Sequence, residues 1–173
     1  MTIGQQILSS FIGTLFGFLF AIVLFLLTDW LYKKKVRKEF RKNLKREFQY
    51  NITLLQDWID KIDVILRQIT AKDREVYQYL KYSDLARYFL DESFKLGLIY
   101  HSFTNEQIFD LNKLVTHCSF GVEQFVNNKI SLWKTCTVLA ENNFQKILLV
   151  DFDFQKSELK RFKKLLEELI KKV

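Results

Sequence analysis

The chain begins with a long apolar stretch in which no charged side chain occurs before Asp29. Between Ile7 and Leu27, 15 of 21 residues are Leu, Ile, Val or Phe, and about 20 such residues span the hydrocarbon core of a bilayer. At about −0.3 to −0.6 kcal/mol each on an insertion scale, they favour the bilayer by roughly 5–9 kcal/mol. Residues 1–32 are therefore predicted to be a transmembrane anchor. A cleaved signal peptide would carry a basic start, which this segment lacks, and a buried helix of a soluble protein seldom runs so long without a charge.

A dense basic block follows the apolar stretch. Residues 33–46 contain nine Lys and Arg against the single acid Glu39, whereas residues 47–173 balance at 18 basic and 18 acidic side chains. The basic excess thus belongs to a juxtamembrane stalk, residues 33–46, and a nucleic-acid-binding fold would instead spread it over a domain face. By the positive-inside rule, we expect a single-pass protein of the cell (inner) membrane, with its N-terminus outside and its C-terminal domain cytoplasmic.

The junction between the two segments predicts two kinds of contact with lipid. Trp30 and Tyr32 favour the headgroup level and are expected to be interfacial anchors. Asp29 beside them can reach water, although a functional carboxylate inside the membrane is the alternative. The first basic residues are predicted to contact anionic lipid, because each contributes about 1 kcal/mol near the surface. These are Lys33, Lys34, Lys35, Arg37 and Lys38.

Small residues recur every fourth position along the apolar stretch. They are Ser9, Gly13, Gly17 and Ala21. A stripe of this kind lets two helix backbones approach closely in lipid. We expect it to mediate self-association, so that the chain forms a homo-oligomer. The alternative is that Gly and Ser are simply common in membrane spans.

The remaining residues, 47–173, are predicted to fold as a cytoplasmic helical domain. The chain has no proline and only five glycines, which favours long helices with short connections. The predicted class is all-α, with the transmembrane helix continuing into an antiparallel bundle or a coiled-coil-like domain, since nothing between residues 30 and 69 breaks a helix. The first helix shows alternating spacings of four and three, a heptad seam. Its members are Phe48, Ile52, Leu55, Ile59, Ile62, Leu66 and Ile69.

Three further helical regions are expected. The second, from Asp73 to Leu96, is rich in tyrosine and ends at Gly97, with a connection over residues 98–103. Thr104 and Gln107 form a capping box that starts the third, and Lys129 interrupts its seam, so this helix bends or ends there or uses Lys129 to set the register. That seam comprises Ile108, Leu111, Val115, Cys118, Val122, Phe125, Lys129, Leu132, Cys136 and Leu139.

The end of the chain is less regular. Residues 144–154 read either as a helix end or as a short extended piece. Ser157 is predicted to cap a last amphipathic helix, whose apolar stripe is Leu159, Phe162, Leu166, Leu169 and Val173. We expect this helix to close the bundle; the alternatives are that it lies on the membrane or binds a partner.

Candidate chemical sites are few. Asp57, Asp60 and Asp63 are spaced like a solvated helix face rather than a metal site. His117 and Cys118 point about 100° apart on a helix, so core positions are expected for them. Cys118 and Cys136 are predicted to stay thiols in the cytoplasm. No phosphate-binding glycine loop, H-E-x-x-H, G-x-S-x-G or C-x-x-C occurs, so we predict no catalytic residues, metal or cofactor.

Two stretches support a resemblance. Residues 46–55 read Arg-Glu-Phe-Gln-Tyr-Asn-Ile-Thr-Leu-Leu and match an E-x-x-x-N-x-x-x-L pattern, and residues 94–99 read Phe-Lys-Leu-Gly-Leu-Ile, a short turn after a second helix. With these stretches the chain resembles a class of uncharacterised prokaryotic small membrane proteins. Those have one N-terminal span, a basic stalk and a cytoplasmic helical bundle. The resemblance implies architecture and location, and no activity.

Three functions are considered for a chain of this architecture. The favoured one is a membrane-tethered interaction or scaffold module that self-associates and binds a cytoplasmic protein partner, with no nucleic acid. The second is a membrane effector, defence- or toxin-like, whose oligomerised spans perturb the membrane on a cytoplasmic trigger. The span offers only Ser9, Ser10 and Thr14 to line a pore, which disfavours a hydrated channel. An enzyme is the third, disfavoured by the missing motifs.

Overall fold

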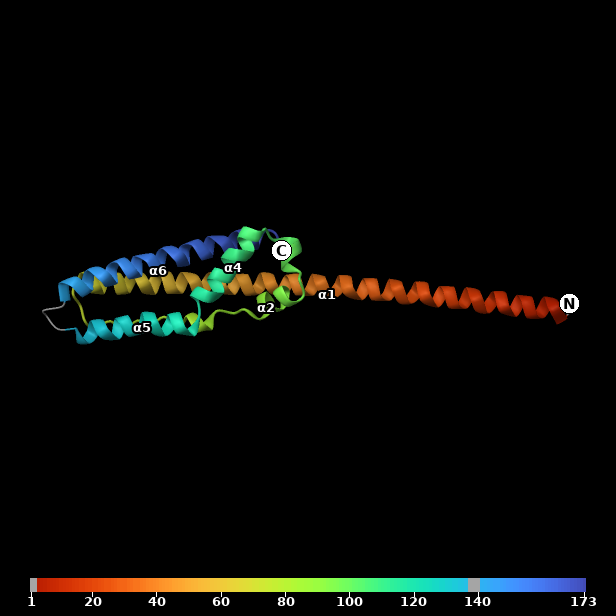
Figure 1. The fold of residues 1–173 in the computed structure, drawn as a ribbon, viewed down its shortest axis with the longest axis horizontal. Coiled ribbons are helices and arrows are strands. Elements are labelled where there is room, and N and C mark those ends of the chain that lie inside the picture. Colours follow the sequence, from red (N-terminus) through yellow and green to blue (C-terminus); the bar gives the residue numbers. More distant parts are fainter. Residues whose placement is uncertain (1–2, 137–140) are drawn as a thin grey trace. The chain divides into compact units, whose positions relative to one another are not determined.

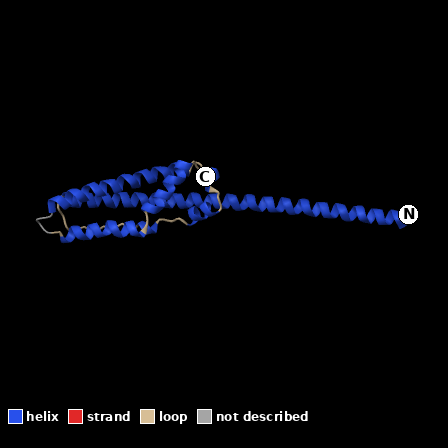
Figure 2. Cartoon of the chain, viewed as in Figure 1, coloured by secondary structure: helices blue, strands red, loops and turns tan. Residues whose placement is uncertain are grey.

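The computed structural model describes residues 3–136 and 141–173 of the chain. Within those ranges all regular secondary structure is helical (Figure 2), which confirms the predicted all-α class. The chain divides into two compact units, unit 1 (Met1–Lys42) and unit 2 (Asn43–Val173).

The first helix, α1 (Ile3–Thr70), is assigned without a break across both units (Figure 1). This agrees with the prediction that no residue between 30 and 69 interrupts a helix. At its end Lys72 adopts a left-handed conformation with φ 57°. The N–H of Lys72 donates to the Ile69 carbonyl at 3.1 Å, and that of Asp73 donates to the Gln68 carbonyl at 2.9 Å. These two bonds form a Schellman motif, which satisfies the last carbonyls of the helix.

Within unit 2, α1 buries a wider stripe than the predicted seam. Of the seam, Ile52 and Leu66 are only half-buried, whereas Trp58 and Ile65, which lie outside it, are at most 1% exposed. The other five seam residues are buried as predicted, namely Phe48, Leu55, Ile59, Ile62 and Ile69. The stripe is wide because α1 is covered by two elements, the last helix α6 (Glu141–Leu169) and the segment that follows α1.

That segment, residues 71–87, is here called the strap. The prediction of a helix from Asp73 to Leu96 was wrong over this segment. It contains only one short 3-10 turn, η1 (Tyr82–Asp84), and α2 does not begin until Tyr88. From residue 75 to 82 burial alternates, with Val76, Leu80 and Tyr82 fully buried and Tyr77 and Tyr79 exposed. A period of two is the pattern of an extended chain. β-Branched and aromatic residues favour extended backbone. This preference is one reason why the strap is extended instead of helical.

The next elements are short. α2 (Tyr88–Lys95) is followed by Gly97 at φ 67°, which confirms the predicted left-handed glycine after a helix. The predicted connection over residues 98–103 contains one further turn, α3 (Ile99–Ser102). Thr104 then caps α4 (Asn105–His117) with the expected capping box to Gln107.

The third predicted helix is in fact two helices with different registers. α4 ends at His117, and Ser119 caps α5 (Phe120–Thr135) by accepting from the N–H of Val122. The break therefore lies ten residues before the expected position at Lys129. Because the break restarts the helix, the buried residues of α5 are Val126, Ile130 and Trp133, each one position after the predicted Phe125, Lys129 and Leu132. Leu139 lies outside the described residues.

The last helix, α6 (Glu141–Leu169), settles the irregular region 144–154 as helical. Ser157 lies inside this helix, where its hydroxyl donates to the Phe154 carbonyl at 2.8 Å, so its predicted role as a cap was wrong. The predicted stripe is buried at Leu159, Phe162, Leu166 and Leu169. It extends back to Leu148 and Phe152, because the helix starts earlier than expected.

Polar contacts fix how the helices of unit 2 lie. α6 runs antiparallel to α1: Lys163 donates to Gln56 at 2.7 Å, Lys156 pairs with Asp63, and Gln145 donates to the Ile69 carbonyl at 2.7 Å. α6 also runs beside α4, where Arg161 and Asp110 approach to 3.5 Å, and beside α5, where Lys129 pairs with Asp151. The apolar stripe of α6 is thus used inside unit 2.

Candidate membrane anchor and interaction surfaces

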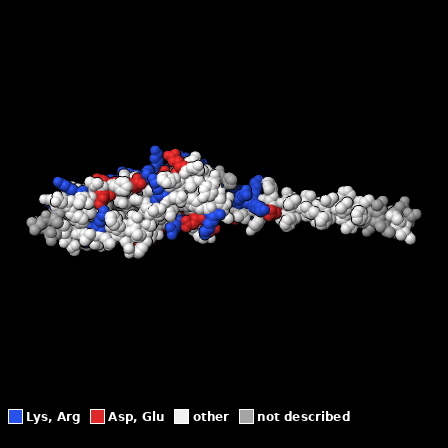
Figure 3. Space-filling model, viewed as in Figure 1, with Lys and Arg blue, Asp and Glu red and all other residues white. Residues whose placement is uncertain are grey.

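The apolar part of α1 leaves its side chains open on every side. Every large apolar side chain from Phe11 to Leu27 is at least 40% exposed, and Phe25 reaches 72%. In the space-filling view this stretch carries no charged side chain until the blue and red residues at its end (Figure 3). In the described part of the chain, α1 is the one helix long and apolar enough to cross a membrane by length and composition. A helix that is apolar all round needs either a protein core or lipid around it.

The small-residue stripe lies on this open surface. Gly13, Gly17 and Ala21 are exposed, and the side chain of Ser9 lies outside the described residues. A Cβ built on Gly13 or Gly17 would meet no atom within 4 Å. Packing within one chain therefore does not require glycine here, although glycine inside a helix costs roughly 0.5–1 kcal/mol relative to alanine.

The predicted interfacial residues are linked to the first lysines. Asp29 and Lys33 form an ion pair at 2.7 Å, so the carboxylate points to the polar side of the junction. The Lys34 ammonium lies 5.0 Å from the Trp30 ring centroid, within cation–π range. Tyr32 is 66% exposed. Aromatic and charged groups thus occupy one turn where the apolar stretch ends.

The basic stalk is accessible over its first residues. Lys35, Arg37 and Lys38 are all exposed, as are Lys33 and Lys34. The first buried side chains come where the block ends, with Leu44 at 5% and Glu47 at 7% exposure. The four lysines and one arginine predicted to contact lipid are therefore all exposed.

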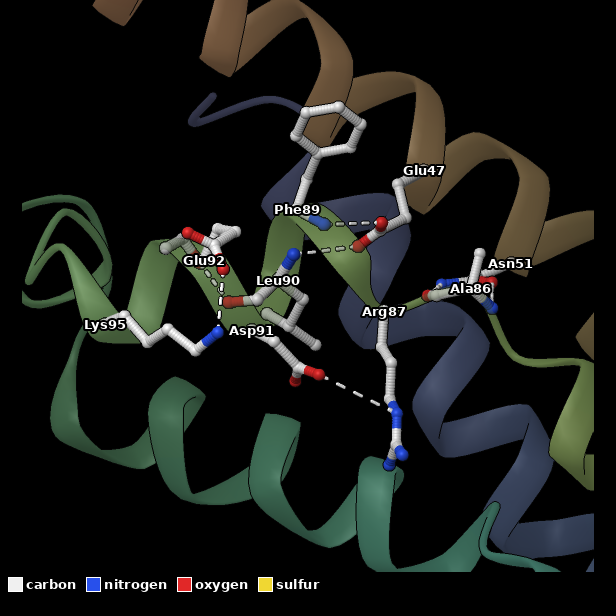
Figure 4. A network of polar contacts seen from close by, with 10 residues as sticks. Glu47, Asn51, Ala86, Arg87, Phe89, Leu90, Asp91, Glu92 and Lys95 are labelled. Atoms are coloured by element: carbon white, nitrogen blue, oxygen red, sulfur yellow. Dashed lines mark hydrogen bonds and ion pairs between the residues drawn. The ribbon is translucent and has the colours of Figure 1, made fainter.

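Glu47 and Asn51 hold the far end of the strap (Figure 4). The Glu47 carboxylate accepts from the N–H groups of Phe89 at 2.8 Å and Leu90 at 2.9 Å, and thereby caps α2 from a neighbouring helix. Asn51 donates to the Ala86 carbonyl at 2.6 Å and accepts from the Ala86 N–H at 2.9 Å. Burial raises the pKa of Glu47, and the backbone donors of α2 oppose that rise.

Asn127 holds the middle of the strap in the same manner. Its amide accepts from the Leu80 N–H at 3.1 Å and donates to the Leu80 carbonyl at 2.8 Å. Glu123, one turn away, accepts from both the N–H and the hydroxyl of Ser83. These side chains replace the strand partner that an extended segment would otherwise need, because buried backbone groups must be paired.

Cys118 is buried, as predicted, whereas His117 beside it is half-buried. The His117 ring lies 6.0 Å from the Tyr82 ring and 5.5 Å from the Phe162 ring. Burial lowers the pKa of His117, raises that of Tyr82, and raises that of the Cys118 thiol to about 12. A thiol so hard to ionise is a poor nucleophile. Cys118 and Cys136 are not joined by a disulfide.

The three aspartates of α1 each have a different partner. Asp57 pairs with Lys61 at 2.6 Å, Asp60 accepts from Gln56 at 2.7 Å, and Asp63 pairs with Lys156. They do not converge on one point. The interpretation as a solvated helix face holds, except that Asp63 also links α1 to α6.

The contacts of Asn51 and Asn127 with the backbone of the strap, here called the polar clamps, were not predicted from the sequence. For Asn51 the sequence does contain a signal. Asn51 lies three residues after Phe48 and four before Leu55, a seam position where an amide is out of place. Asn127 lies two residues before Lys129, where a bend or helix end was one expectation, yet it is a helical residue that pairs with the strap.

No protein-family model, curated protein or solved structure matches the chain. The resemblance to small prokaryotic membrane proteins stays a prediction from the two sequence stretches.

Proposed function

We propose that the chain is a single-pass protein of the cell membrane. Its cytoplasmic helical bundle serves as a membrane-tethered interaction and scaffold module. The observation that carries this proposal is the exposure of every large apolar side chain from Phe11 to Leu27. In water such exposed apolar side chains are unfavourable and drive aggregation, whereas the hydrocarbon core of a bilayer solvates them favourably.

The orientation follows from charge. The five exposed cations after Tyr32 resist transfer across the membrane and are attracted to the anionic lipid of the cytoplasmic leaflet. Unit 2 is therefore cytoplasmic and the N-terminus is outside. Asp29 paired with Lys33, and Lys34 over Trp30, support a lipid–water boundary at this turn.

Self-association through Ser9, Gly13, Gly17 and Ala21 completes the proposal. The open space at Gly13 and Gly17 is what a second helix backbone would fill. A partner protein in the cytoplasm would contact unit 2, since the sequence carries no motif for a reaction or a cofactor.

Extraction and labelling test the anchor and its direction together. The protein should stay with membranes through alkaline carbonate. An Ile3→Cys variant should react with an impermeant maleimide on intact cells, while Tyr50→Cys should react only after permeabilisation. Release by carbonate, or labelling of Tyr50→Cys on intact cells, would overturn the proposal.

Self-association is tested separately. Replacing Gly13 and Gly17 by Ile should abolish the signal of a membrane two-hybrid assay, because two β-branched side chains keep the backbones apart. Leu15→Ile, on the opposite side of the helix, is the matched control and should leave the signal unchanged. An unchanged signal in the double variant would remove this part of the proposal.

A further inference from the structure

α6 carries a second apolar stripe that the fold of unit 2 does not use. Ile147, Val150 and Phe154 are exposed by 56%, 69% and 58%. Their spacings of three and four place them on one side of the helix. The other side holds the buried stripe that includes Leu148 and Phe152. α6 is therefore apolar on two sides, and among the described residues only one of these sides is covered.

α5 enlarges this exposed surface. Phe125 and Leu132 are exposed by 59% and 57%. α5 and α6 run antiparallel, since Lys129 pairs with Asp151 and the Trp133 and Phe144 rings lie 6.4 Å apart. In this alignment Phe125 neighbours Phe154, and Leu132 lies level with Ile147. These five side chains (Phe125, Leu132, Ile147, Val150 and Phe154) form what we call the α5–α6 face. Scattered apolar residues on a surface are ordinary, but a cluster of large ones marks a contact site.

The face contains a groove at one end. It has a volume of about 240 Å³ and is lined by Phe125 and Phe154 at its rim and by Val126 and Phe152 at its floor. The floor residues are at most 2% exposed. The Lys129–Asp151 pair closes one side. A groove of this make-up accepts an apolar side chain.

We propose that the α5–α6 face binds the same face of a second copy of this chain. The charges beside the stripe support a second copy as the occupant. Lys146 and Asp153 are both exposed and lie seven residues apart on one flank of the stripe. If the two α6 helices run antiparallel with Val150 at the centre, Lys146 of each copy meets Asp153 of the other. The stripe then meets itself with opposite charges at its edge.

The proposal rests on the proposed function in one respect, namely confinement to a membrane. A stable interface buries about 800 Å² on each partner, which five side chains supply only in part. Copies held on one membrane surface meet at a high effective concentration, so a small interface suffices.

Disulfide trapping in native membranes tests the face directly. In full-length protein carrying Cys136→Ser, Val150→Cys should give a covalent dimer on mild oxidation, because a two-fold pairing of the stripe brings position 150 against itself. Thr53→Cys, exposed on the polar side of α1, is the control and should give at least about ten-fold less dimer. Equal yields, or a Val150→Cys product whose mass is not that of two chains, would overturn the proposal.

A second variant distinguishes a specific interface from random collisions between copies concentrated on the membrane. Adding Phe154→Glu to Val150→Cys should lower the dimer yield at least about ten-fold, since it places a charge at the groove. Phe109→Glu is matched to it, because Phe109 on α4 has the same 58% exposure and lies outside the face; it should leave the yield unchanged. An equal effect of the two glutamates would count against the face.

The two proposals can fail independently in this experiment. The membrane pellet reports the anchor, and the dimer band reports the face. Membrane-bound protein without a Val150→Cys dimer refutes the face alone, whereas a dimer found only in the soluble fraction refutes the anchor and retains the face.

Discussion

Two stretches of the same helix differ in how they treat apolar side chains. In α1, the stretch from Phe11 to Leu27 exposes them on all sides, whereas the stretch from Asn43 to Thr70 buries one stripe and exposes polar residues elsewhere. Both are α-helical, and neither contains proline. Backbone propensity therefore does not separate them.

The periodicity of the apolar residues distinguishes the two stretches. From residue 43 onward apolar side chains recur at spacings of three and four, so a partner element can cover one side of the helix. In the earlier stretch they fill nearly every position, and no single partner could cover them. The comparison teaches that one continuous helix can carry two apolar patterns, one that protein covers within unit 2 and one that leaves large apolar side chains exposed on every side.

The largest expected effect comes from charging the first stretch. Replacing Leu19 and Phe20 together by Arg should cost roughly 5–7 kcal/mol of insertion free energy, at about 2.5–3.5 kcal/mol each, which offsets most of the gain from the apolar residues. The protein should appear in the carbonate supernatant. The double Ala variant should stay in the membrane pellet, and membrane retention of the Arg variant would show that the stretch is not surrounded by lipid.

The matching change in the second stretch should leave the anchor intact. Trp58 is 1% exposed and packs edge-on against the Tyr82 ring at 5.1 Å, so Trp58→Ala should lower the free energy of unfolding of unit 2 by about 3–5 kcal/mol. Urea titration of the full chain in detergent micelles, followed by limited proteolysis, measures this. Tyr50→Ala, at 53% exposure, should change it by less than about 0.5 kcal/mol. Equal costs for both would contradict the assigned core side.

A smaller effect is expected where polar side chains support the strap. Asn127→Ala leaves the N–H and carbonyl of Leu80 without their partner, at a cost of about 1–3 kcal/mol. Hydrogen exchange should accelerate at Leu80 more than at Ala86, whose partner is Asn51. Asn128→Ala, which is exposed, should leave both rates unchanged. Acceleration throughout unit 2 would mean that Asn127 supports the whole fold rather than the strap.

The smallest effect concerns pH. Burial lowers the pKa of His117 below 6.5, so the unfolded chain binds a proton at a higher pH than the folded chain does. Stability should therefore fall as pH drops below about 6.5. His117→Gln should flatten this dependence when the urea midpoint is compared at pH 7.5 and 5.5. An equally steep pH dependence in the variant would assign it to other groups.

Local signals were enough to predict part of the fold. The glycine after α2 and the Thr104–Gln107 capping box each depend on a few neighbouring residues, and both were predicted. The seam of α1 was found in outline, but Trp58 and Ile65 were missed because burial on two sides depends on what packs there.

Features fixed by distant partners were not predictable in the same way. Tyr77 and Tyr79 were predicted to be helical. They are extended because Asn51 and Asn127, which lie far away in the sequence, hydrogen-bond to the backbone of the strap. Lys129 looked like a break because its partner Asp151 belongs to another helix. For the candidate surfaces, the apolar stretch and the basic block can be found from composition alone, whereas the α5–α6 face depends on the register shift at Ser119.

The most direct test of the account is the solvent around each stretch of α1. Spin labels placed one at a time along residues 11–27 and 45–60 can be probed in reconstituted bilayers for collisions with oxygen, which partitions into lipid, and with a water-soluble nickel chelate. We predict that every label from 11 to 27 favours oxygen, while labels from 45 to 60 favour the chelate with a period of about 3.6 residues. Chelate access with that same period along residues 11–27 would contradict a lipid-embedded anchor.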